Sequence, residues 1–222
     1  MKQPTAIITG ISRGIGRACA ALFLEEGWKV VGTSTSGKAP FAANSLEIYA
    51  LDLANPENIQ EFALDIRKSY PKVNALVNNA AILVESWSSS EVSLDILRHT
   101  FEVNFFGTVH LTEALLNTLQ PGAAVINLSS GWGTFSDPSF SAEVPHYKMS
   151  KTAINMYSKL LAHRLKDREI KVHALNPGWV KTDMGTSAAT KSPSMAAKEI
   201  LNAIQNSLPT GSFLNGNRIG TY

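Results

Sequence analysis

A tyrosine and a lysine stand four residues apart in the segment PHYKMSK, at Tyr147 and Lys151. Residues at this spacing are neighbours on one face of a helix. A free phenol has a pKa of about 10, too high for ready proton exchange at neutral pH. A positive charge at about 4 Å contributes roughly 4 kcal/mol at an effective dielectric constant of about 20, which would lower that pKa toward about 7. The pair therefore predicts acid–base chemistry, although most single Tyr-x-x-x-Lys spacings only reflect helix packing.

The elements that must position this pair alternate between apolar strands and helices. Regular alternation of this kind predicts a doubly wound parallel sheet, of about seven strands, with helices on both faces. Ligands of such sheets bind beyond the carboxyl ends of the strands. The predicted strands cover 5–10, 28–34, 46–52, 73–81, 123–130, 170–178 and 211–216. The predicted helices cover 14–27, 56–70, 194–208 and the segment around Tyr147, and residues 93–119 are expected to form one or two long helices.

Length and composition predict a single domain over residues 1–222. The chain is 44% hydrophobic, and its net charge of +2 is spread along the sequence, which argues against a nucleic-acid partner. The only cysteine, Cys19, excludes a disulfide within the chain, and the five histidines form no ligand-like cluster, so no metal is expected. The apolar run near the amino end is too short for a signal peptide or a membrane span. We therefore expect a cytoplasmic protein without a membrane partner.

A glycine-rich turn, TGISRGIG, follows the first predicted strand and opens a helix, with glycines at 10, 14 and 16. Glycines permit a tight turn and a close approach of the backbone to a ligand, and the helix amino end offers unpaired N–H groups to a pyrophosphate. The alternative is a turn that only packs. Its position between a strand and a helix favours a dinucleotide site.

The end of the second predicted strand lacks the acid that usually accepts the ribose hydroxyls of NAD. No Asp or Glu occurs between Glu26 and Glu47, and hydroxyl groups follow the strand instead, with Arg13 in the glycine turn and Lys38 beyond. Hydroxyls and a guanidinium bind a 2′-phosphate that a carboxylate would repel. We therefore predict NADP(H) over NAD(H), the alternative being that both cations are solvated surface charges.

Taken together, these motifs resemble the short-chain dehydrogenase/reductase family over essentially the whole chain, and most closely its carbonyl reductase branch. The resemblance implies a three-layer Rossmann-type α/β fold. It rests on the glycine turn, LDL, NNAA, EVNFFGT, NLSSGWG, the Tyr–Lys pair and NPGWVKTDM, in this order. The cofactor-binding positions that it implies are Gly10, Ser12, Arg13, Ile15, Gly16, Ser34, Thr35, Ser36, Asp52, Leu53, Asn79, Ala80, Ala81, Tyr147, Lys151, Pro177, Gly178, Val180 and Thr182.

The same resemblance implies a catalytic set of four residues. Tyr147 would donate a proton to the substrate carbonyl oxygen, and Lys151 would lower the tyrosine's pKa and bind the nicotinamide ribose. Ser130 would hydrogen-bond the same oxygen, and Asn104 would position Lys151 through water. Each residue has a structural alternative, since a serine can simply end a strand and an asparagine can be an ordinary helix residue.

Two departures from the family pattern lie beside the expected cavity. Ala81 replaces the usual glycine of its turn, and Ser130 and Tyr147 stand further apart than is typical, with the extra residues in FSDPSFSAEVP. The substrate mouth should therefore differ in shape. The substrate-pocket candidates are Leu83, Trp132, His146, Trp179 and Met184, together with Trp87 and Phe135, which are as easily packing or surface residues; residues 182–195 are expected to form a substrate-side loop.

The predicted activity is NADPH-dependent reduction of a small, mainly apolar ketone or aldehyde, in a homodimer or homotetramer. One alternative is an NADP(H)-binding sensor or regulatory protein with little catalysis, which would not need Asn104, Ser130, Tyr147 and Lys151 together. Another is a nucleotide-sugar epimerase or dehydratase, which usually has a different glycine spacing and a longer carboxyl-terminal substrate domain.

Overall fold

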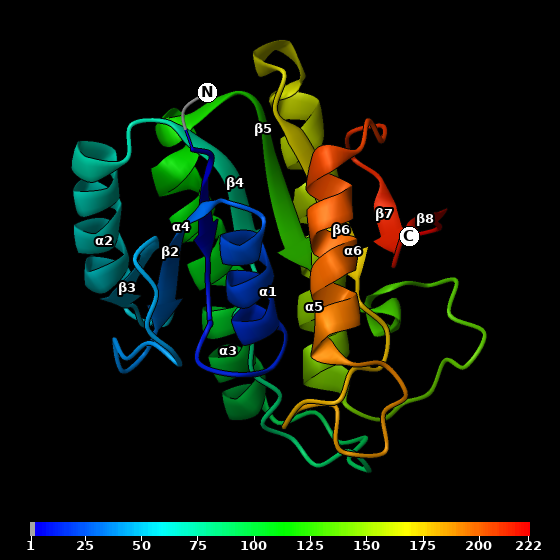
Figure 1. Ribbon diagram of the computed structural model, residues 1–222. Helices are drawn as coiled ribbons and strands as arrows, with labels where there is room; N and C mark the ends of the chain where they lie inside the picture. The colour runs from blue at the N-terminus through cyan, green and yellow to red at the C-terminus, as the bar shows by residue number, and fades with distance from the viewer. Residues whose placement is uncertain (1–2) are drawn as a thin grey trace.

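The computed structural model describes residues 3–222 and is built around one eight-stranded sheet in the order β3-β2-β1-β4-β5-β6-β7-β8 (Figure 1). All neighbouring pairs are parallel except β7 and β8. The central strands are runs of buried apolar residues, as expected for a sheet covered on both faces. The strands are β1 (Thr5–Ile8), β2 (Lys29–Ser34), β3 (Leu46–Ala50), β4 (Val73–Asn78), β5 (Leu119–Leu128), β6 (Lys171–Asn176), β7 (Phe213–Asn215) and β8 (Arg218–Gly220).

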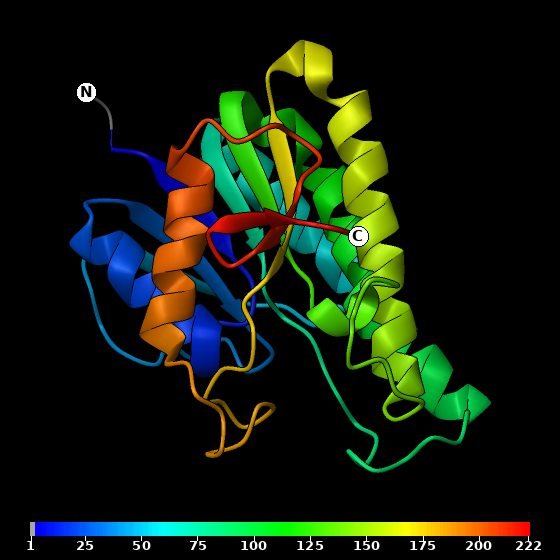
Figure 2. The ribbon, with the colours of Figure 1, turned by 90° about the vertical axis from the view of Figure 1, so that its right-hand side faces the viewer.

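Helices cover both faces of the sheet and give a three-layer arrangement (Figures 1 and 2). On one face, α1 (Gly14–Glu25) and α6 (Pro193–Gln205) pack side by side over an apolar core that includes Phe23 and Ile200. On the other face, α2 (Pro56–Ser69), α4 (Thr108–Leu115) and α5 (Pro145–Arg164) enclose a second core. The predicted α/β, doubly wound, Rossmann-type fold is confirmed.

The structure differs from the prediction in three places. The sheet gains an antiparallel edge strand, β8, and the predicted loop 182–195 ends early because α6 begins at Pro193. Residues 93–119 form two helices, α3 (Leu94–Phe101) and α4, as one of the predicted alternatives has it, but a π-helical turn η1 (Glu102–Gly107) joins them and a 3-10 turn follows. Single π-helical turns often mark functional positions, and Asn104 lies in this one.

The strand order reverses between β1 and β4, so the crevice for a ligand lies at the carboxyl ends of these strands. Figure 2 shows the segments that follow β4 and β6 at this same end of the molecule. Within residues 3–222, no helix is both long and apolar enough to cross a membrane.

Candidate active site

A cavity of about 1100 Å³ opens at the carboxyl ends of the strands. Segments that are far apart in the sequence line it: the glycine turn after β1 and the loops after β2, β3, β4, β5 and β6. This is the place that the strand order indicates for a ligand. Within residues 3–222, no group of three or more His, Cys, Asp or Glu side chains is arranged to hold a metal ion.

The glycine turn forms the floor of this cavity beneath α1. Gly10 has a φ of 71°, a left-handed conformation that favours glycine. A Cβ added to Gly16 would lie 2.2 Å from the Gly10 carbonyl oxygen, so α1 can approach the turn only because residue 16 has no side chain. The Asn79 side chain donates to the carbonyl oxygens of Thr9, at 2.8 Å, and Gly10, at 3.2 Å, which joins the turns after β1 and β4.

The amino end of α1 suits a phosphate group. Its N-cap residue, Arg13, makes no side-chain capping bond, and the first turn carries no acidic residue. The positive end of the helix dipole is therefore not neutralised within the helix, as expected where an anionic ligand binds.

At the end of β2, Thr33, Ser34 and Thr35 line the cavity, whereas Ser36 does not. The Ser36 hydroxyl accepts the N–H of Lys38 and so stabilises the turn that follows β2. Arg13 also lines the cavity, and its guanidinium pairs with Asp183 at 2.9 Å across the opening, with both side chains largely exposed. No carboxylate of β2 faces the cavity.

Every other predicted cofactor position except Gly16 lines the cavity, and Gly16 shapes it from below. These positions are Gly10, Ser12, Ile15, Asp52, Leu53, Asn79, Ala80, Ala81, Tyr147, Lys151, Pro177, Gly178, Val180 and Thr182.

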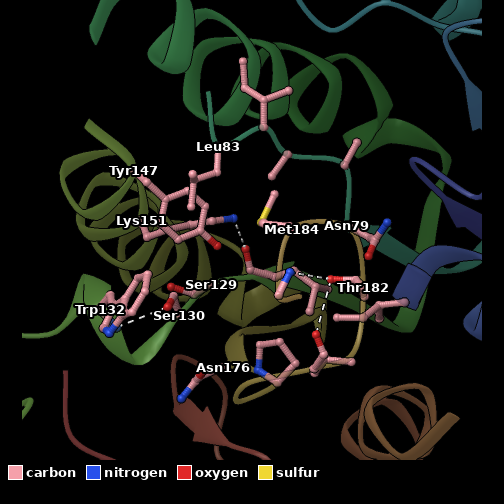
Figure 3. A pocket seen from close by; sticks show the side chains of 18 of the residues that line it. Asn79, Leu83, Ser129, Ser130, Trp132, Tyr147, Lys151, Asn176, Thr182 and Met184 are labelled. Carbon is pink, nitrogen blue, oxygen red and sulfur yellow. Dashed lines mark hydrogen bonds between the residues drawn. The ribbon is translucent and has the colours of Figure 1, made fainter. Parts of the chain in front are cut away.

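Tyr147, Lys151 and Ser130 lie together in one part of the cavity (Figure 3). Lys151 Nζ donates to the carbonyl oxygen of Leu128 at 2.7 Å and lies 5.4 Å from the centre of the Tyr147 ring. Ser130 Oγ accepts the N–H of Trp132 at 3.2 Å, so its own hydroxyl hydrogen does not serve that bond. The neighbouring Ser129 hydroxyl donates to Asn155 instead and is buried. Ser130 is therefore the better placed of the two serines to donate to a ligand.

The predicted direction of the tyrosine's pKa shift is wrong in this structure. Tyr147 is only 8% exposed, and burial raises its pKa above the ordinary value of 10 because it disfavours the phenolate. Burial also lowers the pKa of Lys151 to about 8. The lysine lies over the ring and is hydrogen-bonded to Leu128, and burial outweighs its charge. Tyr147 is therefore protonated at neutral pH, which is the form that a proton donor requires.

Asn104 does not line the cavity. It is buried, and its side chain accepts the N–H of Ile82 at 2.8 Å and donates to the Ile82 carbonyl oxygen at 2.9 Å. It also donates to Ser150 Oγ at 3.2 Å. Asn104 thus joins the loop after β4 to Ser150 of α5, between Tyr147 and Lys151, and its role in positioning Lys151 through water stays a prediction.

Four of the five substrate-pocket candidates line the cavity and one does not, and a role in substrate binding stays a prediction for all of them. Leu83, Trp132, Trp179 and Met184 line the cavity, whereas His146 is buried outside it against Glu85. Of the two further candidates, Trp87 lines the cavity and packs edge-on against Trp132 at 5.4 Å, whereas the side chain of Phe135 is directed to solvent and is 85% exposed.

Other cavity residues were missed by the sequence reasoning. The unusual length of the segment after β5 was a signal for Ser136, Asp137 and Pro138, but nothing local identifies residues of the edge strands. The additional lining residues are Leu51, Ala54, Ile82, His99, Val103, Leu128, Ser129, Gly131, Thr134, Ser136, Asp137, Pro138, Asn176, Phe213, Asn215, Gly220 and Thr221. Thr33, one of the hydroxyl residues at the end of β2, and Gly185, in the predicted substrate-side loop, line the cavity as well.

Comparisons with known proteins agree with this geometry. The family model described as short chain dehydrogenase matches residues 4–193. The chain is 28% identical over 204 residues to dehydrogenase/reductase SDR family member 7B of Mus musculus, covering 86% of this chain and 62% of that protein. It is 32% identical over 195 residues to a 3-oxoacyl-acyl-carrier-protein reductase of Vibrio cholerae, covering 83% and 76%. The chain thus spans less than two thirds of the length of the first relative.

Solved structures share the whole architecture. A short-chain dehydrogenase/reductase from Burkholderia multivorans with bound NADP superimposes with a TM-score of 0.89 at 27% identity, over 100% of both chains. The carbonyl reductase Sniffer of D. melanogaster gives a TM-score of 0.86 at 26% identity, over 99% of both chains. With a family model that covers most of its length, and with the glycine turn and the Tyr–Lys pair in one cavity, this chain belongs to the short-chain dehydrogenase family of oxidoreductases.

Proposed function

We propose that the protein is an NADPH-dependent carbonyl reductase that converts a small, mainly apolar ketone or aldehyde to an alcohol. One observation carries the proposal. The cavity that contains the glycine turn and the uncapped amino end of α1 is also lined by Tyr147, Lys151 and Ser130, and Tyr147 is buried and protonated. The similar structure from Burkholderia multivorans holds NADP, and Sniffer is a carbonyl reductase. Both similarities support the same assignment.

The cavity residues fit a dinucleotide with a 2′-phosphate. The amino end of α1 would receive the pyrophosphate, and Ser34, Thr35 and Arg13 would surround the 2′-phosphate at the end of β2. One carboxylate oxygen of Asp52 accepts the N–H of Ala54 at 2.9 Å. This hydrogen bond holds Asp52 in the part of the cavity wall where we expect the adenine ring. When bound, NADPH supplies the hydride.

Three side chains perform the proton chemistry in this proposal. Tyr147 donates its phenolic proton to the carbonyl oxygen as the hydride reaches the carbon, so that an alcohol and a phenolate are formed. The Ser130 hydroxyl donates a hydrogen bond to the same oxygen and stabilises its developing charge. The Lys151 ammonium stabilises the phenolate and binds the ribose of the cofactor. Asn104 holds the loop after β4 in place against α5 through its hydrogen bonds with Ile82 and Ser150.

The substrate side of the cavity favours apolar compounds. Leu83, Trp132, Trp179 and Met184 supply apolar surface, and Trp132 meets the Tyr147 ring edge-on at 6.5 Å. Lys191 holds the substrate-side loop at its base, because its Nζ donates to the Pro177 carbonyl oxygen at 2.7 Å. The part of the loop before Lys191 is thus the part that can close over a substrate.

The test is a panel of ketones, aldehydes, quinones and ketoesters, assayed by the loss of NADPH absorbance, with NADH in parallel reactions. Turnover of apolar members with a strong preference for NADPH supports the proposal. Tight NADPH binding without turnover of any member would instead identify a cofactor-binding sensor. Equal efficiency with NADH would refute the choice of cofactor.

We also propose a homodimer or homotetramer in which α5 and the α4 region form the interface. Apolar side chains there face solvent in the single chain, with Phe106 52% exposed and Met156 and Leu160 each 62% exposed. Light scattering after gel filtration tests this assembly, and a monomer at micromolar concentration would refute it. The cytoplasmic location stays a prediction.

A further inference from the structure

The helix that carries Tyr147 begins without a cap of its own. The first four N–H groups of a helix lack partners within it. In α5 the N-cap residue is Val144, which has no side-chain acceptor and a left-handed φ of 48°, and its N–H donates to the Ser89 carbonyl oxygen at 2.8 Å. Pro145 has no N–H. The N–H groups of His146 and Tyr147 therefore need acceptors from elsewhere in the chain.

The carboxylate of Glu85 accepts both of them. Oε1 accepts the N–H of Tyr147 at 2.9 Å, and Oε2 accepts the N–H of His146 at 3.3 Å. The side chain of Glu85 is only 2% exposed. A carboxylate at a helix amino end is also favoured by the helix dipole. Glu85, some sixty residues earlier in the chain, thus performs the role of the missing capping side chain.

The His146 side chain completes this arrangement. Its Nε2 accepts the N–H of Ser93 at 2.9 Å, so a neutral imidazole must carry its proton on Nδ1. Nδ1 is the atom that contacts Glu85 Oε2, and it donates to that oxygen. Every polar atom of His146 and both carboxylate oxygens of Glu85 therefore have partners.

We propose that Glu85, held by His146, is a positioning residue that fixes Tyr147 relative to the rest of the cavity. Glu85 lies in the loop after β4, and the earlier residues of this loop, Asn79 to Leu83, line the cavity. The carboxylate therefore ties one wall of the cavity directly to the backbone of the proton donor. This inference rests on the proposed function, because it assigns Glu85 a role in the proton transfer by Tyr147.

The test compares Glu85→Ala and Glu85→Gln with wild type and with the matched control Glu113→Gln. Glu113 holds the other end of the same helix, because Oε1 accepts from the Tyr157 hydroxyl at 2.8 Å and from Arg164 at 2.6 Å. The measurements are kcat for carbonyl reduction, the Kd for NADPH, the melting temperature, and hydrogen exchange of the His146 and Tyr147 amides.

Glu85→Ala is expected to lower kcat on the order of 10-fold to 100-fold, since small misplacements of reacting groups have effects of that size. The Kd for NADPH should stay within about threefold of wild type, because the loss affects only the chemical step. Glu85→Gln keeps one acceptor for the Tyr147 N–H and should fall between wild type and Glu85→Ala. Glu113→Gln should keep the wild-type kcat despite a lower melting temperature.

Wild-type kcat in Glu85→Ala would overturn the proposal, as would an equal loss of kcat in Glu113→Gln at the same loss of melting temperature. If Glu85→Ala does not fold, a Glu85→Gln protein with unchanged kcat has the same consequence. If wild type reduces no carbonyl compound, the proposed function fails separately. Faster amide exchange at Tyr147 in either Glu85 variant would still support the capping role, and unchanged exchange would refute it.

Discussion

Replacing Lys151 by methionine should stabilise the protein at neutral pH and abolish its turnover. Lys151 is 3% exposed, and burial lowers its pKa from 10.5 to about 8. Below pH 8 the amine is charged in both the folded and the unfolded state, and the fold bears the free-energy cost of burying that charge. Above pH 10.5 the amine is neutral in both states, and the cost is absent. The stability of wild type should therefore rise with pH across this window.

The pKa difference sets the magnitude. A shift from 10.5 to about 8 corresponds to about 3 kcal/mol at pH 7. At pH 10 most of this cost has gone, and roughly 1 kcal/mol remains. Methionine also loses the hydrogen bond from Nζ to the Leu128 carbonyl oxygen, but a neutral amine still makes that bond, so this loss does not depend on pH. The stability difference between Lys151→Met and wild type should therefore fall by about 2 kcal/mol from pH 7 to pH 10.

Urea unfolding of both proteins at pH 7 and pH 10 measures this change, because groups that titrate in both proteins cancel in the comparison. A difference in unfolding free energy that stays constant between the two pH values would refute the reasoning. It would show that Lys151 is not a buried charge in the folded protein.

Three further predictions concern the cofactor and the pH dependence of the rate. Gly16→Ala places a Cβ 2.2 Å from the Gly10 carbonyl oxygen and should weaken NADPH binding by at least about 10-fold, as measured by fluorescence titration; unchanged affinity would show that the turn relaxes easily. Arg13→Ala should raise the KM for NADPH by roughly 10-fold and leave the KM for NADH unchanged. The control Asp183→Asn removes only the partner of Arg13 and should not raise the KM for NADPH. Equal effects of the two variants would show that Arg13 serves only its ion pair with Asp183. The value of kcat/KM for carbonyl reduction should fall above about pH 8 as Lys151 loses its charge, and a flat profile up to pH 10 would contradict this role.

The sequence was sufficient for the sheet and for most of the cavity. Apolar strands and their order along the chain indicated the fold, and the residues that follow each strand necessarily meet at one edge of a parallel sheet. This is why the sequence alone predicts that Ser130, Asn79 and Thr182 lie together with the Tyr147 helix, and all three line the same cavity as Tyr147.

What the sequence did not show depends on long-range contacts and on burial. His146 is among the substrate-pocket candidates, but its side chain lies outside the cavity, where Glu85 from a distant loop accepts a hydrogen bond from its Nδ1. The direction of the Tyr147 pKa shift depends on how deeply the ring is buried, which a Tyr-x-x-x-Lys spacing does not reveal. The π-helical turn that carries Asn104 has no sequence signal comparable to a glycine or proline.

The most direct test of the account is a single-turnover measurement on Tyr147→Phe with bound NADPH and an apolar carbonyl compound. Phenylalanine keeps the ring but has no proton to donate. We expect wild-type affinity for NADPH and hydride transfer that is slower by on the order of a thousandfold. Oxidation of NADPH by Tyr147→Phe at the wild-type rate would contradict the assignment of this tyrosine as the proton donor.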